Sequence, residues 1–185
     1  MRVVAGTARG IKLDTIEGLA TRPTTDRVKE AIFSMIHNEL YGAKVLDLFS
    51  GSGGLSIEAA SRGAEKVTLV ENSKKCIEII KKNIQKSRLN DKIEVVQQDV
   101  DRFLERLPVD AGFDFVVMDP PYLKGFIEPI LLCIDEKKII KVGGMVIVEH
   151  DMTDVLAETY GTLQLEKKKK YGKTAVSVYR RHQND

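Results

Sequence analysis

Residues 44–71 read KVLDLFSGSGGLSIEAASRGAEKVTLVE, and their pattern is the strongest indication of the fold class. An apolar run at 44–49 precedes a glycine-rich loop, and a second apolar run at 66–71 follows the segment GLSIEAASRG. That segment has the length of a short helix and ends at Gly63, a residue favoured just after helices. The order strand, loop, helix and strand is typical of an α/β unit with parallel strands.

The same alternation continues along the chain. Further strands are predicted at 92–99, 113–119 and 144–150, and further helices at 73–88, 100–107 and 126–138. Continuous apolar strands joined by helices indicate a parallel sheet covered on both faces. Residues 162–181 alternate polar and apolar side chains around a YGK turn, which indicates an antiparallel hairpin. We therefore predict an α/β fold with a Rossmann-like, doubly wound, mostly parallel sheet of seven strands that ends in this C-terminal hairpin.

The N-terminal residues suggest a small addition to this sheet. Two short alternating runs at 2–6 and 10–16 predict a hairpin, and apolar residues at helical spacing after TRPTTD predict a helix from about residue 26. We expect a single domain over 1–185, with a basic N-terminal extension at 1–29 and a catalytic core at 30–185.

Composition is that of a soluble globular protein. Of 185 residues, 43% are apolar and 30% are charged, and no apolar run approaches the roughly 18 residues of a membrane span. The first residues lack the apolar core of a secretory signal, so we expect a cytoplasmic protein with no membrane partner.

Basic charge gathers at the two ends of the chain. Residues 1–29 carry a net charge of +3 and residues 161–185 one of +5, whereas the whole chain carries only +2. If these ends fold near each other, they form a positive face suited to a polyanion.

Cysteine and histidine give no sign of a metal or a disulfide. Cys76 and Cys133 lie in apolar helical patterns without a C-x-x-C spacing, so we interpret them as buried thiols. The histidines His37, His150 and His182 lie far apart in sequence, and we assign them no chemistry. No metal site is expected.

The glycine loop with the acid that follows it predicts a nucleoside cofactor. Gly51 and Gly53 allow positive φ and close approach of a ligand, and the next helix directs free N–H groups toward it. Glu71 ends the second strand, twenty residues after Gly51, where a carboxylate can accept ribose hydroxyls.

The chemistry of the loop favours S-adenosylmethionine over NAD. Asp47 would repel a pyrophosphate but can hold the ammonium of a methionine moiety. Ser56 stands where the dinucleotide motif has its third small residue, a modest departure that leaves an NAD-dependent oxidoreductase open. Asp99 ends the third predicted strand, and we weigh two roles equally: acceptor for the adenine amine, or cap of the next helix.

The stretch VMDPPY at 117–122 ends the fourth predicted strand with two prolines. Prolines lack a backbone donor, so the carbonyl of Pro120 and the carboxylate of Asp119 present acceptors at the edge where parallel sheets bind ligands. Such acceptors suit an exocyclic base amine. Tyr122 adds a flat face for stacking an unpaired or flipped base. We interpret Asp119 as a positioning acceptor rather than a strong general base, and a simple proline-rich turn is the alternative.

At these residues the chain resembles class I S-adenosylmethionine-dependent methyltransferases with an Asp/Asn-Pro-Pro-aromatic motif. The segments RVVAGTARGIKL, TRPTTDRVKEAIFSMI, VLDLFSGSGGLSIEAASRGA and DPPY narrow the resemblance to the ribosomal RNA small-subunit methyltransferase D (RsmD) family over essentially the whole chain. This resemblance implies methylation of guanine N2 in 16S rRNA, free or in a 30S assembly particle, by a protein that we expect to be monomeric. The family often has Phe where Tyr122 stands.

The resemblance also assigns roles to particular residues. It implies cofactor contacts from Asp47, Gly51, Gly53, Glu71 and Asp99, and target-base contacts from Asp119, Pro120 and Tyr122. It places Arg22, Thr24, Asp26 and Arg27 along the approach to cofactor and RNA.

Read from its charges, the N-terminal segment predicts phosphate contacts, which fix register without reading sequence. The candidates are Arg2, Arg9, Lys12, Arg22 and Arg27. Lys167–Lys170 fit a solvated strand face or an RNA contact. Three other functions stay open: an N6-adenine DNA or glutamine protein methyltransferase, the NAD-dependent oxidoreductase, and a non-catalytic RNA-binding module.

Overall fold

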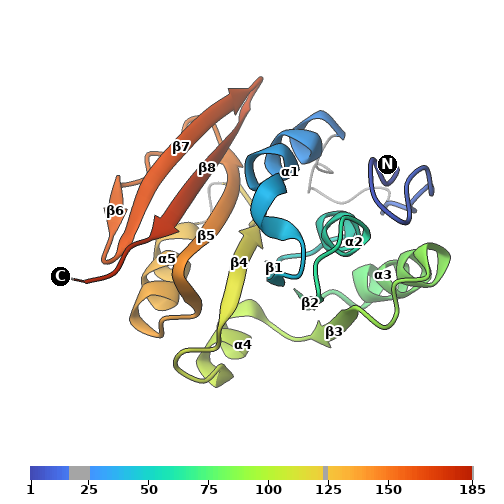
Figure 1. Cartoon of the computed structure of the whole chain (residues 1–185), viewed down its shortest axis with the longest axis horizontal. Coiled ribbons are helices and arrows are strands. Elements are labelled where there is room, and N and C mark those ends of the chain that lie inside the picture. The colour runs from blue at the N-terminus through green and yellow to red at the C-terminus, as the bar shows by residue number, and fades with distance from the viewer. Residues whose placement is uncertain (17–25, 123–124, 185) are drawn as a thin grey trace. The chain divides into compact units, whose positions relative to one another are not determined.

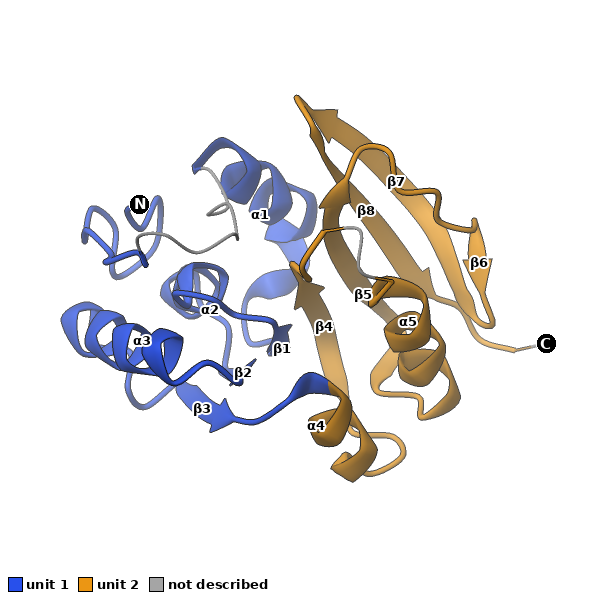
Figure 2. Cartoon of the chain, turned by 180° about the vertical axis from the view of Figure 1, so that it is seen from behind, with its two compact units in different colours: residues 1–100 blue, residues 101–185 orange. Residues whose placement is uncertain are grey.

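The structure is a computed structural model that describes residues 1–16, 26–122 and 125–184 (Figure 1). The chain divides into two compact units, unit 1 over residues 1–100 and unit 2 over residues 101–185 (Figure 2). The prediction of a single domain with an N-terminal extension stays a prediction.

Unit 1 contains a parallel sheet of three strands, β1 (Lys44–Leu48), β2 (Lys66–Glu71) and β3 (Ile93–Gln97). β2 lies between the other two and pairs in parallel with both. Four of the five β1 residues and four of the six β2 residues are buried, as the continuous apolar runs predict. The carboxyl ends of β1 and β2 therefore lie side by side.

Three helices complete unit 1: α1 (Asp26–Leu40), α2 (Gly54–Ser61) and α3 (Lys74–Ser87). Every residue of α2 is buried, including the polar Ser56, Glu58 and Ser61. α3 buries a single face with Cys76, Ile77 and Ile80, and Ser73 caps its start by accepting a bond from the Cys76 amide at 3.4 Å.

The N-terminal residues pair as predicted but form no strand within the described range. Arg2 and Lys12 make an isolated antiparallel bridge, supported by bonds from the Val3 amide to the Ile11 carbonyl and from the Leu13 amide to the Met1 carbonyl, both at 2.9 Å. We call residues 1–16 the N-terminal segment. It lies beside α2 and α3 in both views (Figures 1 and 2).

Unit 2 contains the second set of strands. β4 (Phe113–Met118) pairs in parallel with β5 (Ile140–Asp151), and β8 (Thr174–Arg181) pairs antiparallel with β5. In the sheet, β7 (Leu163–Tyr171) lies next to β8 and pairs antiparallel with it. The short β6 (Thr159–Tyr160) lies on the other side of β7, also antiparallel. The described residues thus hold eight strands, so the predicted count of seven is wrong by one. The missed strand is β6, because two residues show no alternation.

Two helices accompany these strands. α4 (Val100–Arg106) begins at the last residue of unit 1, and α5 (Ile127–Glu136) follows the DPPY segment. Lys137, just after α5, donates to the carbonyls of Leu104, Glu105 and Leu107 at 2.7–2.9 Å. This lysine donates to carbonyl groups that have no partner within the helix at the end of α4.

Within residues 1–16, 26–122 and 125–184, no helix has the length and apolar character needed to cross a bilayer. The same residues contain no group of three or more His, Cys, Asp or Glu side chains arranged to hold a metal ion.

Candidate cofactor and substrate site

The loop after β1 has an unusual backbone. Phe49, Gly51 and Gly53 all have positive φ, at +61°, +59° and +83°. Glycine adopts this region without cost, but a bulky aromatic residue there is an outlier of the kind that gathers at functional sites. The Gly53 amide closes the turn by donating to the Ser50 carbonyl at 2.9 Å, and Gly53 precedes the first turn of α2.

The two predicted glycines serve different purposes. Glycine is favoured at position 53 for two reasons: its φ is positive, and a Cβ there would lie 3.3 Å from Cγ1 of Ile80 in α3. A Cβ at Gly51 would meet nothing within 4 Å. The backbone at Gly51 therefore borders open space, which a ligand can approach closely.

Glu71 and Gly51 are joined directly by a hydrogen bond. The Gly51 amide donates to Glu71 Oε2 at 2.9 Å, and the amides of Asn72 and Ser73 donate to Oε1 at 3.1 Å each. An ionised carboxylate can accept about four hydrogen bonds. Three backbone donors thus fix the carboxylate at the end of β2 and leave it capacity for one more donor.

Asp47 lies inside unit 1, beneath the same loop. Its side chain is 1% exposed, and Oδ2 accepts a 2.6 Å bond from the Ser56 hydroxyl. Burial raises the pKa of Asp47 to about 7, the Ser56 and Ser50 hydrogen bonds oppose this rise, and the negative charge of Glu71 adds to it. Ser56 was noted in the sequence as a departure from a dinucleotide motif, and its hydroxyl is the partner of this acid.

Asp99 is exposed between β3 and α4. Its position at the carboxyl end of β3 is compatible with contact to the adenine amine and with a cap on α4, so both roles stay predictions.

A buried polar cluster attaches the N-terminal segment to α2. Glu58 accepts from the Val4 amide at 2.8 Å and the Ala5 amide at 3.1 Å, and Lys29 lies 3.1 Å from the same carboxylate. Ser61 accepts from the Ala8 amide at 2.9 Å and donates to the Ala5 carbonyl at 2.7 Å. No sequence pattern predicts this cluster, because its charged and polar residues lie far apart in the chain.

One side chain connects the N-terminal segment to the glycine loop. Asn83 in α3 donates to the carbonyls of Asp14 and Ser52 at 2.9 and 3.0 Å and accepts from the Asp14 amide at 2.8 Å. Asn83 has no solvent exposure. Asn83 thus connects the glycine loop, through Ser52, to Asp14 of the N-terminal segment.

The DPPY segment lies in unit 2, directly after β4. Asp119 and Tyr122 are half-buried and Pro120 is buried. The Tyr122 hydroxyl lies 3.1 Å from the hydroxyl of Thr174, the first residue of β8. Thr174 was not among the predicted residues, and no sequence signal connects it to a residue 52 positions away.

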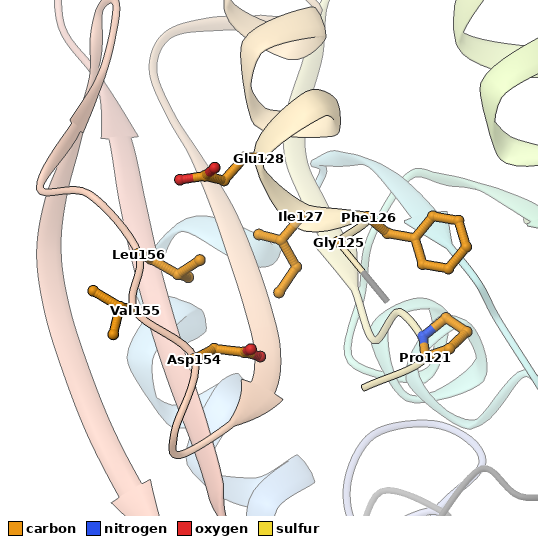
Figure 3. A pocket seen from close by; sticks show the side chains of 8 residues that line it. All are labelled: Pro121, Gly125, Phe126, Ile127, Glu128, Asp154, Val155 and Leu156. Atoms are coloured by element: carbon orange, nitrogen blue, oxygen red, sulfur yellow. The ribbon is translucent and has the colours of Figure 1, made fainter. Parts of the chain in front are cut away.

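A pocket of about 180 Å³ borders this segment within unit 2 (Figure 3). Pro121 forms one side, residues 125–128 at the start of α5 form another, and residues 154–156 close the third. Glu128 in its wall accepts from the Tyr160 hydroxyl at 2.9 Å. The pocket is mostly apolar, with the carboxylates of Glu128 and Asp154 at its edge.

The predicted RNA contacts fall partly within the described residues. Arg2, Arg9, Lys12 and Arg27 are exposed in unit 1. Arg2 and Lys12 are bridge partners, so their side chains share one face of the N-terminal segment. Arg22 and Thr24 lie outside the described residues.

A glycine loop after the first parallel strand, a carboxylate at the end of the second and a DPPY segment after the fourth are features of class I methyltransferases. The solved structure named "Putative methyltransferase yhhF from Escherichia coli" matches with a TM-score of 0.87 and 30% identity over 98% of both chains. The predicted fold class is therefore confirmed.

The sequence narrows this class. Residues 1–180 match the family described as Conserved hypothetical protein 95. The Bacillus subtilis protein named "Putative rRNA methyltransferase YlbH" is 40% identical over 98% of this chain and 99% of its own length. Ribosomal RNA small subunit methyltransferase D of Haemophilus influenzae is 33% identical over 100% of this chain and 94% of its own. The chain therefore belongs to the family described as Conserved hypothetical protein 95, and the predicted membership of the ribosomal RNA small-subunit methyltransferase D family is confirmed.

Proposed function

We propose that the protein uses S-adenosylmethionine to methylate the exocyclic N2 amine of a guanine in 16S rRNA. The observation that supports the proposal is the DPPY segment directly after β4, in which the Tyr122 hydroxyl is held 3.1 Å from that of Thr174. We assign Asp119 and Pro120 as the acceptors for the amine. Membership of a family whose relatives are named for rRNA methylation supports the substrate class. We further propose a cytoplasmic monomer that acts on 16S rRNA, free or in a 30S assembly particle.

The loop of unit 1 fits this cofactor. Gly51 borders open space, and Glu71 retains capacity to accept a ribose hydroxyl after its three backbone bonds. Asp47 offers a carboxylate for an ammonium group, which favours an amino-acid moiety over a pyrophosphate. Asp99 is the proposed acceptor for the adenine amine. When bound, S-adenosylmethionine supplies a methyl group already activated by its sulfonium charge.

The chain contributes positioning rather than acid–base chemistry. An exocyclic amine is a poor nucleophile because its lone pair is delocalised into the ring. The Asp119 carboxylate and the Pro120 carbonyl accept hydrogen bonds from its two N–H groups and favour a pyramidal nitrogen with an available lone pair. Holding the amine in line for attack is the main catalytic contribution expected of these residues.

Tyr122 supplies the stacking surface for the base. Stacking on an aromatic side chain contributes about 1–3 kcal/mol per base in single-strand binding proteins. A base inside a helix cannot present its amine to DPPY, so the target is proposed to be unpaired or flipped out. The basic side chains of the N-terminal segment then hold the flanking phosphates.

The alternatives differ in substrate or in chemistry. A DNA adenine methyltransferase or a protein glutamine methyltransferase would use the same DPPY acceptors. An NAD-dependent oxidoreductase would place a pyrophosphate at the loop above Asp47, where its charge is disfavoured. An RNA-binding module without activity would need the N-terminal arginines but not Asp119.

A substrate panel decides among these functions. Labelled methyl transfer should appear in undermodified 30S particles or naked 16S rRNA, and nuclease digestion should assign it to guanine N2. Label in DNA alone, or in protein, would overturn the proposal. Binding of NADH without binding of S-adenosylhomocysteine would remove the methyltransferase function itself.

A variant pair tests the role of DPPY. Asp119→Ala should abolish methylation while S-adenosylhomocysteine binding is retained, because Asp119 is assigned to the amine and not to the cofactor. Asp91→Ala removes an exposed carboxylate in unit 1 and is the matched control. Full activity in Asp119→Ala would show that the amine is held elsewhere.

A further inference from the structure

We propose that the end of the β7–β8 hairpin binds the RNA phosphates that flank the target base, an inference that rests on the proposed function. The surface consists of Lys167–Lys170 in β7 and Lys173 in the turn, and we call it the lysine hairpin. It is separate from the arginines of the N-terminal segment. The sequence left its role open between a solvated face and an RNA contact.

The lysine hairpin concentrates exposed positive charge on a rigid element. All five lysines are exposed, whereas the β8 residues opposite them, Ala175–Val178, are buried. The register pairs Lys167 with Val178 and Lys170 with Ala175. Gly172, with φ of +63°, makes the tight turn that returns the chain into β8. The backbone below the lysines is thus fixed by the sheet.

This charge is not balanced within the part of unit 2 that the structure describes. Glu166, the acid within β7, is paired with Arg180 at 3.0 Å. None of the ion pairs found among the described residues includes a lysine of the hairpin. Five unbalanced ammonium groups on one hairpin end favour a polyanionic partner.

The position of the hairpin relates this charge to the proposed target base. The hydroxyls of Tyr122 and Thr174 are 3.1 Å apart, and Thr174 is the first residue after the turn that carries Lys173. Lys170 pairs with Ala175, the neighbour of Thr174. Tyr171 pairs with Thr174, so with about 5 Å between paired Cα atoms and a rise of about 3.3 Å per residue, Lys169, Lys170 and Lys173 have Cα atoms within about 10 Å of that of Thr174.

A nucleotide stacked on Tyr122 would therefore bring its neighbouring phosphates to the lysine hairpin. Lysine binds phosphate as a mobile point charge, which suits contacts that fix register without reading sequence. Thr174 contacts the Tyr122 hydroxyl and also begins the strand that follows the turn of the lysine hairpin. Because the proposed base-stacking ring and the lysines are joined through this residue, the geometry points to single-stranded RNA as the partner rather than to an acidic protein.

A different role for these lysines makes a different prediction. Charged side chains on sheet edges prevent edge-to-edge association, and β6 pairs with β7 only at Leu163 and Gln164 in the described residues. If the lysines serve this purpose alone, their loss should cause association of the protein and leave RNA affinity unchanged.

The test is the triple variant Lys169→Gln, Lys170→Gln, Lys173→Gln with undermodified 16S rRNA as the probe. We expect RNA affinity to fall at least fivefold at moderate salt. The slope of log affinity against log salt should become shallower by about 2, since each lost phosphate contact on a single strand removes about 0.7. S-adenosylhomocysteine affinity should not change.

Two further variants control for charge and for folding. Lys74→Gln, Lys75→Gln, Lys81→Gln removes three exposed charges from α3 and should leave the salt slope as in the wild type. The triple variant Lys169→Arg, Lys170→Arg, Lys173→Arg keeps the positive charge and should bind RNA like the wild type. Sedimentation of each variant reports association through the sheet edge.

The outcomes separate the two proposals. An unchanged salt slope in the glutamine variant, or equal competition by polyglutamate, would overturn the role of the lysine hairpin even if the wild type methylates 16S rRNA. Methylation of DNA alone by the wild type would instead overturn the proposed function. RNA affinity is measured by filter binding without cofactor, so this readout does not depend on turnover.

Discussion

Lys29 Nζ lies 3.1 Å from Glu58 Oε1, and neither side chain has any solvent exposure. Lys29 also donates to the Arg2 carbonyl at 2.6 Å, and Glu58 accepts from the amides of Val4 and Ala5. This ion pair thus joins α1, α2 and the N-terminal segment. A buried charge pair of this kind is stable only while both partners and their hydrogen bonds are present.

Removing one partner should therefore destabilise the fold strongly. Lys29→Met removes the fully buried cation beside Glu58 and leaves Arg62, 3.1 Å from Oε2, as its remaining counter-ion, so we expect the free energy of unfolding to fall by about 3 kcal/mol, the lower end for breaking a buried pair. Denaturant titration measures this loss. Lys86→Met, which breaks the exposed pair with Asp14, is the matched control and should leave stability nearly unchanged. Equal effects of the two variants would contradict the structural role of the buried pair.

Asp47 should make stability depend on pH in an identifiable window. Burial raises its pKa from 3.8 to about 7 in the folded protein. Below pH 4 both states hold the proton, and no penalty arises. Between pH 4 and 7 the unfolded state releases the proton while the folded state retains it, so stability falls as pH rises, by at most about 4 kcal/mol. Above pH 7 the penalty is constant.

The variant Asp47→Asn isolates this effect from all other carboxyl groups. Asn retains an acceptor for the Ser56 hydroxyl but does not titrate. The difference in unfolding free energy between the variant and the wild type should grow in favour of the variant from pH 4 to 7 and then level off. A difference that is flat over this range would show that Asp47 has an ordinary pKa.

The same acid should make cofactor affinity rise with pH. If the Asp47 carboxylate holds the ammonium of the amino-acid moiety, binding favours the ionised form, and affinity for S-adenosylhomocysteine should increase through pH 7. Calorimetric titration at several pH values measures it. Methylthioadenosine, which lacks the ammonium, should show no such rise, and neither should the Asp47→Asn variant. A parallel rise for both ligands would place the titrating group elsewhere.

Glu71 should matter for the shape of the cofactor loop as well as for ligand contact. Glu71→Ala removes the acceptor of the Gly51, Asn72 and Ser73 amides together with the proposed ribose acceptor. We expect S-adenosylhomocysteine affinity to fall at least tenfold, consistent with about 1.5–3 kcal/mol for hydrogen bonds to a charged group. Glu78→Ala in α3, an exposed carboxylate, is the control. Unchanged affinity in Glu71→Ala would remove this residue from the site.

The sequence predicts those parts of the molecule that depend on local pattern. The second strand was predicted at 66–71, and β2 occupies the same residues, because an apolar run between charged ends has few other interpretations. That Gly51 and Glu71 lie near each other was predictable, because β1 and β2 are neighbouring parallel strands and both residues lie at their carboxyl ends, but the hydrogen bond between them was not predicted. β6 was missed because its two residues carry no periodicity.

Contacts that depend on tertiary packing could not be predicted. Lys29 and Glu58 are charged residues within helical patterns, and such residues are ordinarily solvated, so nothing in the sequence indicates that they meet in the core. Thr174 is a similar case, since its hydroxyl acquires a role only when β8 begins beside Tyr122. Ser56 was visible in the sequence as a departure from the dinucleotide motif. Its hydrogen bond to Asp47 was not, because it forms only when the first turn of α2 packs against β1.

The Tyr122 hydroxyl gives the last prediction, because it separates stacking from orientation of the ring. Tyr122→Phe keeps the aromatic face but loses the bond to Thr174. We expect kcat/KM for 16S rRNA to fall by about 2- to 10-fold, as expected for one hydrogen bond of about 0.5–1.5 kcal/mol. Tyr122→Ala also loses the stacking surface and should fall further, by another 5- to 100-fold or so. Thr174→Val should match Tyr122→Phe, and the double variant should be no worse than either single one, since both remove the same bond. Additive losses in the double variant would show that the two hydroxyls act independently.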